Sequence, residues 1–84
     1  MKSITVLIIN KGESGGSMSR SIYLNEKTTV ASLIEAKNEL FAQADAVYGR
    51  WSYEVEDNIM NDEAFTPQEE QMLKECELEV DAIY

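Results

Sequence analysis

The first part of the chain alternates between apolar and polar positions in a way that predicts two strands. Residues 3–10 are apolar on both faces, and Leu7 and Ile9 lie on the face opposite to the other apolar residues. A strand of this kind is typical of the centre of a sheet. A polar loop with three glycines follows, and residues 17–25 alternate again with Tyr23 on the outer face. We therefore predict an antiparallel hairpin.

The segment after the hairpin has the apolar spacing of a helix. Apolar side chains recur at intervals of three and four from Val30 to Ala44, and Lys37 lies inside this stripe. Thr29 suits the N-cap position, and Gly49 ends the segment. Because the stem of a lysine can cover an apolar surface while its ammonium group reaches water, Lys37 is compatible with the stripe. We predict one helix packed on one face of the sheet.

The last third of the chain predicts a third strand, a helical turn and a final strand. Residues 51–56 alternate, and residues 59–61 are expected to add a short strand. Thr66 and Pro67 favour the N-cap and the first position of a single helical turn. Residues 75–84 alternate acidic with apolar side chains, which predicts a strand with one core face and one charged face.

This order of elements predicts an α+β protein with a single domain over residues 1–84. If the final strand lies parallel to the first, between the first and the third, the apolar stripe of the helix is buried against one face of the sheet. The result is a β-grasp (ubiquitin-like) roll, a mixed sheet of four to five strands packed on one helix.

Two short motifs carry a resemblance to a known family. Residues 28–40 read TTVASLIEAKNEL and resemble the Thr-Val-x-x-Leu-Leu/Ile helix start of the small sulfur-carrier proteins of thiamine and molybdopterin synthesis. Residues 73–80 read LKECELEV and are similar to the Leu-x-x-Gly-Asp-x-Val strand entry of that family. The resemblance implies a ubiquitin-like β-grasp fold.

The same comparison of motifs shows two departures from the family pattern. Cys76 and Glu77 stand where Gly-Asp is usual, and residues 82–84 read Ala-Ile-Tyr where a carrier ends in Gly-Gly. Because the diglycine is the group that a carrier activates, the resemblance implies the fold without the carrier chemistry. A sulfur-carrier-like protein stays among the alternatives.

The charge of the chain is strongly asymmetric. The net charge is −9, but residues 1–50 hold six basic and five acidic groups, whereas residues 51–84 hold one basic and eleven acidic groups. Carboxylates repel phosphate backbones, so we expect no direct binding of nucleic acid. A basic protein surface is the natural complement of the acidic region.

Composition argues against catalysis, metal binding and membrane insertion. The chain has no histidine and one cysteine, Cys76, so zinc and iron–sulfur sites are not expected. The pattern Gly-x-Ser-x-Gly occurs at residues 12–16, but a nucleophile elbow needs a histidine base and a strand-to-helix turn. The longest apolar run, ITVLII, is far shorter than a membrane span. We expect a cytoplasmic protein that is no enzyme and needs no cofactor.

The candidate site is the sheet face opposite the predicted helix. In the predicted roll this face gathers a row of carboxylates with an apolar anchor beside them. The carboxylates are Glu54, Glu56, Glu75, Glu77, Glu79 and Asp81, and the anchor consists of Leu7, Ile9 and Tyr23.

Two functions suit such a surface. The first is a non-catalytic ubiquitin-like module that binds a basic protein partner. The alternative is an acidic nucleic-acid mimic, such as an inhibitor from a phage or mobile element, whose carboxylates take the place of phosphates. Both need the same residues, and the oligomeric state stays open.

Overall fold

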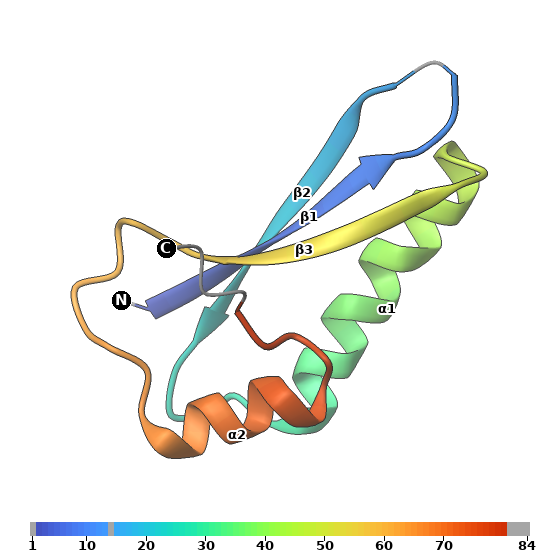
Figure 1. Ribbon diagram of the computed structural model, residues 1–84. Coiled ribbons are helices and arrows are strands. Elements are labelled where there is room, and N and C mark those ends of the chain that lie inside the picture. The colour runs from blue at the N-terminus through green and yellow to red at the C-terminus, as the bar shows by residue number, and fades with distance from the viewer. Residues whose placement is uncertain (1, 14, 81–84) are drawn as a thin grey trace.

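The structure, a computed structural model, describes residues 2–13 and 15–80. It contains a three-stranded antiparallel sheet of order β2-β1-β3 and two helices that cover one face of it (Figure 1). In chain order the elements are β1 (Lys2–Asn10), β2 (Ser17–Leu24), α1 (Val30–Val47), β3 (Trp51–Asp57) and α2 (Pro67–Glu75). The protein is therefore α+β, as the pattern predicts.

Strand β1 is the central strand, which confirms the prediction from its two apolar faces. It pairs with β2 from Lys2 to Ile9 and with β3 from Ile4 to Asn10. The side chains of Ile4, Val6 and Ile8 point toward the helices and are fully buried. They form the floor of the core on which both helices pack.

Helix α1 connects the two edges of the sheet. Strands β2 and β3 are both antiparallel to β1, so they run parallel to each other and need a crossover connection. The helix supplies it, packing Leu33, Leu40 and Ala44 into the core. Its first turn is closed by a capping box in which the Thr29 hydroxyl accepts from the Ser32 N–H at 3.1 Å. The predicted helix and its N-cap are confirmed.

Helix α2 is longer than the single turn that the sequence predicts. The Thr66 hydroxyl accepts from the Glu69 N–H at 3.1 Å, and the Glu69 carboxylate accepts from the Thr66 N–H at 2.9 Å. This capping box confirms Thr66 as the N-cap. Because Glu69, Leu73 and Cys76 follow at helical spacing and are all buried, the helix continues to Glu75.

The prediction of a final strand over residues 75–84 is wrong for the part that the structure describes. Glu75 ends α2, Cys76 and Glu77 form a turn, and residues 78–80 follow in no strand. Strands β1 and β3 pair directly, so no strand lies between them. Cys76 is apolar and buried because it belongs to the core-facing stripe of α2. Residues 81–84 lie outside the described residues.

The predicted short strand at residues 59–61 is a turn. The Asn61 N–H donates to the Asn58 carbonyl at 3.0 Å, and the Met60 N–H donates to the Asn58 side chain at 3.1 Å. The side-chain amide of Asn61 forms the two hydrogen bonds that a paired strand residue would form with Ser3. Its amide oxygen accepts from the Ser3 N–H, and its amide nitrogen donates to the Ser3 carbonyl, both at 2.8 Å. One side chain thus extends the β1–β3 ladder by one residue.

We expect Asn61→Ala to lower the free energy of unfolding by about 1–2 kcal/mol, because it leaves the backbone of the buried residue Ser3 without partners. Urea unfolding followed by circular dichroism measures this. Asn38→Ala, on the exposed side of α1, is the matched control and should change stability by at most a few tenths of a kcal/mol. Equal effects of the two substitutions would show that the Asn61 side chain does not complete the ladder.

Candidate interaction surface

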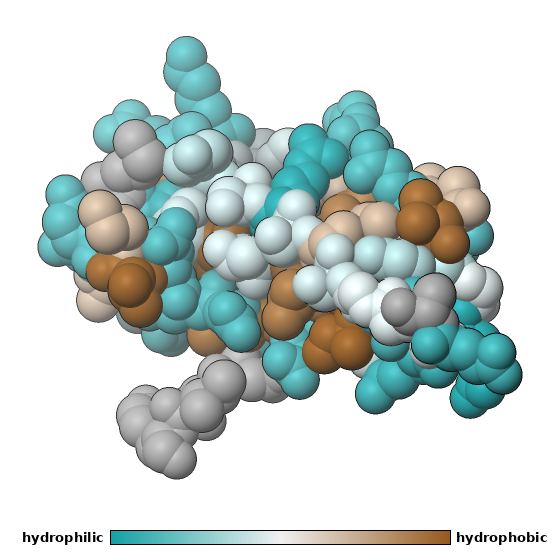
Figure 2. Space-filling model, turned by 90° about the horizontal axis from the view of Figure 1, so that it is seen from above, coloured by the Kyte–Doolittle hydropathy of each residue, from teal (hydrophilic) through white to brown (hydrophobic). Residues whose placement is uncertain are grey.

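The sheet face opposite the helices is open. The register places Leu7 between Ser19 of β2 and Glu54 of β3, so this row runs from a hydroxyl through an apolar side chain to a carboxylate. Thr5 lies in the next row, between Ser21 and Glu56. Figure 2 shows this side of the molecule, where apolar residues are interleaved with weakly polar ones and strongly polar residues surround them.

The structure brings together two of the three predicted anchor residues. Leu7 and Ile9 are half-buried neighbours on the open face. Tyr23 lies on the same face and is 58% exposed, but it pairs with Ser3 at the other end of β1. Four residues of strand separate that row from Leu7, a distance of about 13 Å. The apolar anchor therefore consists of Leu7 and Ile9, and Tyr23 stands apart.

The structure separates the predicted row of carboxylates into two groups. Glu54 and Glu56 lie on the open face along β3, as the alternation predicts. Glu75, Glu77 and Glu79 do not, because α2 continues through Glu75 and the chain then turns. Asp81 lies outside the described residues.

Two of the displaced carboxylates meet Glu54 at the outer edge of β3. A shallow groove of about 460 Å³ is lined by Glu54, Glu77 and Glu79. Tyr53 and Val55 also line it, and its one basic side chain is Lys74. The groove, here called the acidic groove, joins β3 to the segment after α2. Lys74 and Tyr53 were not among the predicted site residues; the helical spacing from Glu69 to Cys76 indicates that Lys74 lies on α2, whereas nothing in the sequence pairs Tyr53 with the end of this helix.

The wall of the acidic groove is a tight helix end. The Leu78 N–H donates to the Leu73 carbonyl at 2.7 Å and the Glu77 N–H to the Lys74 carbonyl at 3.1 Å. These two bonds form a Schellman motif, whose left-handed position is occupied by Glu77 with a φ of 58°. A residue other than glycine costs roughly 1 kcal/mol there. Other contacts must therefore hold this turn.

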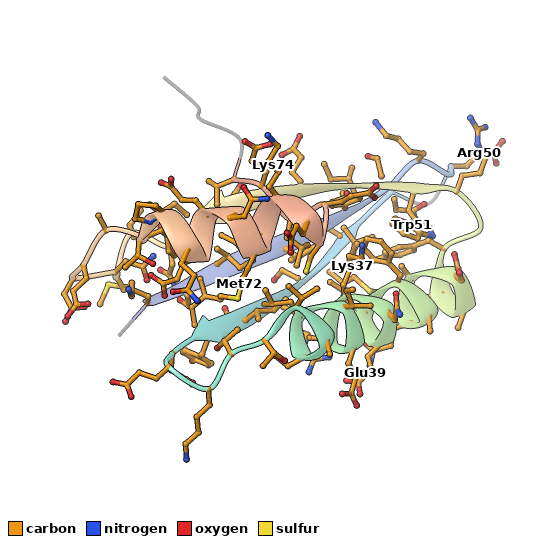
Figure 3. The ribbon with its side chains drawn as sticks, turned by 90° about the horizontal axis from the view of Figure 1, so that it is seen from below. Lys37, Glu39, Arg50, Trp51, Met72 and Lys74 are labelled. Atoms are coloured by element: carbon orange, nitrogen blue, oxygen red, sulfur yellow. The ribbon has the colours of Figure 1, made fainter. Side chains whose placement is uncertain are left out.

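Side chains from α1 and β3 supply those contacts. The Tyr53 hydroxyl donates to the Glu77 carbonyl at 2.8 Å, and the Lys37 ammonium donates to the Cys76 carbonyl at 2.8 Å. Lys37 extends from α1 toward the end of α2 (Figure 3) and lies over the Phe41 ring. A cation at a helix C-terminus is stabilising. The lysine inside the apolar stripe thus caps α2 and does not end in solvent.

The carboxylates of the acidic groove outnumber its one basic side chain, Lys74, and form no ion pair among the described residues. Across residues 2–13 and 15–80, ion pairs join Lys2 to Glu63 and Glu69, and Arg20 to Glu39. None of these involves a groove carboxylate. Like charges on adjacent segments cost stability, about 0.2–1 kcal/mol for a pair directly opposed on strands. A cationic group in the groove would remove this repulsion.

Three further features of the described residues bear on chemistry: the thiol, the possible metal ligands and the glycine-rich loop. Cys76 is buried, and burial raises the pKa of its thiol, so the thiolate is disfavoured at neutral pH. No group of histidine, cysteine, aspartate and glutamate side chains among the residues described is arranged to hold a metal ion. The glycine-rich loop connects β1 to β2, which confirms a hairpin loop and not a strand-to-helix elbow.

Neither described helix has both the length and the apolar character needed to cross a membrane. Residues 82–84, where the chain departs from the carrier motif, lie outside the described part of the chain. Comparison with family models, with curated proteins and with solved structures finds no match to this chain.

Proposed function

We propose that the chain is a non-catalytic, ubiquitin-like interaction module that binds a basic protein partner at the acidic groove and the adjoining open sheet face. The observation that carries the proposal is the convergence of Glu54, Glu77 and Glu79 on one groove without an ion pair among the described residues. These carboxylates come from two segments more than twenty residues apart in sequence.

The chemistry of the site fits lysine and arginine side chains. Tyr53 lines the groove and can contact the stem of an arginine there, while the carboxylates accept hydrogen bonds from its guanidinium group. Leu7 lies in the same row as Glu54, so an apolar side chain of the partner can cover it. A basic segment with an apolar residue beside its charges meets both needs.

The β-grasp relationship is also a proposal. The β1–β2 hairpin, the crossover helix α1 and the packing of α1 on the sheet support it. The described sheet departs from a complete roll at one place: a last strand would lie between β1 and β3, which here pair directly. Cross-strand NOEs between Leu7 and Glu54 would establish direct pairing of β1 with β3 in solution. Their absence, with NOEs from Leu7 to residues after Leu78, would establish the complete roll.

The binding proposal is tested with a charge-reversal pair. After a partner is isolated by affinity capture from the native host, its affinity for Glu54→Lys/Glu79→Lys is measured by calorimetry over a salt series. We expect a loss of at least about tenfold and a shallower salt dependence. The control Glu13→Lys/Glu35→Lys makes the same change in net charge on exposed positions outside the acidic groove, and should lose far less.

Two outcomes would contradict the proposal. If both double variants bind alike, the acidic groove is not the binding site. If an excess of oligonucleotide displaces the chain from its partner, the carboxylates stand in for phosphates and the protein is a nucleic-acid mimic.

A further inference from the structure

The outer edge of β2 presents backbone groups that nothing in the described chain pairs. The Asn10 N–H donates to the Gly16 carbonyl at 3.1 Å, which sets the phase of the β1–β2 ladder. Hydrogen-bonded positions alternate in an antiparallel ladder, so the even-numbered residues of β2 bond to β1. The N–H and C=O groups of Ser17, Ser19 and Ser21 therefore point outward. The next outward carbonyl, that of Tyr23, receives only a long bond of 3.5 Å from Thr28.

This edge lacks the features that keep exposed strands from pairing. Charged residues, proline and bulges are the usual protection. Strand β2 holds one charged residue, Arg20, and no proline, and its register with β1 is unbroken from Ser17 to Leu24. Strand β3, at the other edge, holds three carboxylates in seven residues. One edge of the sheet is thus protected by charge and the other is not.

We propose that a second copy of the chain pairs with this edge, β2 against β2 in antiparallel orientation, to form a continuous six-stranded sheet. Two copies of a chain with a net charge of −9 repel each other wherever their acidic residues meet. The β2 edge has no acidic residue in its strand, and its exposed serines are self-complementary because each hydroxyl both donates and accepts.

The two-fold axis passes beside Ser21. Outward-facing residues must meet outward-facing residues, so the axis can lie at any residue of β2, and the central choices are Arg20, Ser21 and Ile22. An axis at Ile22 pairs only Ser21 with Tyr23 inside the strand, which gives fewer backbone hydrogen bonds. An axis at Arg20 would oppose two guanidinium groups, which is unfavourable. An axis at Ser21 pairs Tyr23 with Ser19 of the second copy and overlaps most of the strand. It gives roughly six backbone hydrogen bonds, two for each hydrogen-bonded pair.

This dimer accounts for the exposed ring of Tyr23, which would lie against the β2 strand of the second copy. It is independent of the proposed function, because the acidic groove lies at the β3 edge on the other side of β1. Both grooves of the dimer stay accessible.

The first test is the mass of the particle in solution, measured by light scattering after gel filtration across a dilution series. We expect twice the 9.5 kDa of one chain. Ser21→Pro removes an outward N–H and no internal bond, so the fold should survive and the mass should halve. Ser21→Ala keeps the N–H and should leave the dimer intact. A wild-type chain that is monomeric throughout, or a folded Ser21→Pro variant that stays dimeric, overturns the proposal.

If Ser21→Pro does not fold, Ser21→Lys takes its place. It keeps the backbone and sets two ammonium groups side by side on the axis, so the mass should again halve. A folded Ser21→Lys variant that remains dimeric overturns the proposal.

A second test fixes the register. Hydrogen-bonded residues on paired strands have Cα atoms about 5.5 Å apart, within the range of a disulfide. We expect Ser21→Cys to form a covalent dimer with oxidised glutathione as the oxidant. Ser17→Cys, whose counterpart would lie about 26 Å away, should not. The native Cys76 is buried and does not compete. Equal cross-linking of both variants, or preferential cross-linking at Ser17, overturns the register.

Discussion

Leu78→Ala is expected to lower the free energy of unfolding by about 3–4 kcal/mol, as truncation of a fully buried leucine does in a packed core. Leu78 belongs to no helix or strand, yet its side chain is 0% exposed and lies in the core cluster with Leu73. In the Schellman motif, the residue after the left-handed position commonly packs on the helix. The segment after α2 is therefore part of the folded core, although its backbone is irregular.

Ile59→Ala is the matched control for Leu78→Ala. It removes a comparable number of carbon atoms from a side chain that is 96% exposed, so stability should change by less than about 0.5 kcal/mol. Urea unfolding followed by circular dichroism gives both values. If the two variants were equally stable, Leu78 would not be packed in the core, and the wall of the acidic groove would lack its support.

The N-terminal half of the fold could be predicted from the sequence because its patterns are long and regular. Leu7 and Ile9 marked β1 as a central strand, because the side chains of a central strand are flanked by those of two neighbouring strands and lose more of their exposure to water. The spacing from Val30 to Ala44 covers four helical turns, which no strand reproduces. The N-cap preference of threonine at Thr29 predicted the start of the helix within one residue.

The prediction of a strand in the C-terminal third is wrong because the end of a short helix can show the same alternation of polar and apolar residues as a strand. Glu75, Cys76, Glu77 and Leu78 alternate acid and apolar, which satisfies a period of two. Two different structures produce this alternation here: Cys76 is buried as part of α2, and Leu78 is buried by the turn that follows. Glu69, Leu73 and Cys76 have the spacing of one helix face. This face is hard to recognise in the sequence because its first member is a glutamate and not an apolar residue.

The candidate site was predictable where it depends on a single strand. Glu54 and Glu56 lie on the open face because the alternation of β3 is regular. The acidic groove depends instead on how α2 ends against β3, and this is set by two long-range hydrogen bonds, from Tyr53 and from Lys37. Such contacts leave no periodic signal in the sequence.

Glu69, the unexpected acid in the core-facing stripe of α2, is expected to contribute strongly to stability. Its carboxylate accepts a hydrogen bond from the Lys2 ammonium at the start of β1 and one from the Thr66 N–H. The side chains of Lys2 and Glu69 are 13% and 11% exposed. Glu69→Gln should keep the capping box, because glutamine serves equally well at that position. It should lower the free energy of unfolding by about 2 kcal/mol, because the mostly buried ammonium group keeps only the exposed Glu63 carboxylate, 3.9 Å away, as a counter-charge.

The pH dependence of this loss identifies its electrostatic origin. Burial on its own raises the pKa of Glu69, but the hydrogen bonds from Lys2 and Thr66 outweigh it, so the pKa lies below its ordinary value. A carboxylate with a lowered pKa stabilises the folded state above the unfolded pKa of about 4.3, and this contribution is lost as the pH falls through the folded pKa. The difference in stability between the wild type and Glu69→Gln should therefore be largest near neutral pH and shrink below about pH 4.

Glu70→Gln is the control for Glu69→Gln, because Glu70 is exposed in the same first turn of α2. Its loss should stay below about 0.5–1 kcal/mol, the size of a helix-dipole interaction at the surface. Urea unfolding of the three proteins at several pH values supplies the comparison. A Glu69→Gln deficit that persists unchanged into the acid range would mean that the carboxylate acts through shape alone. The ion pair with Lys2 would then not be what joins the end of the sheet to α2.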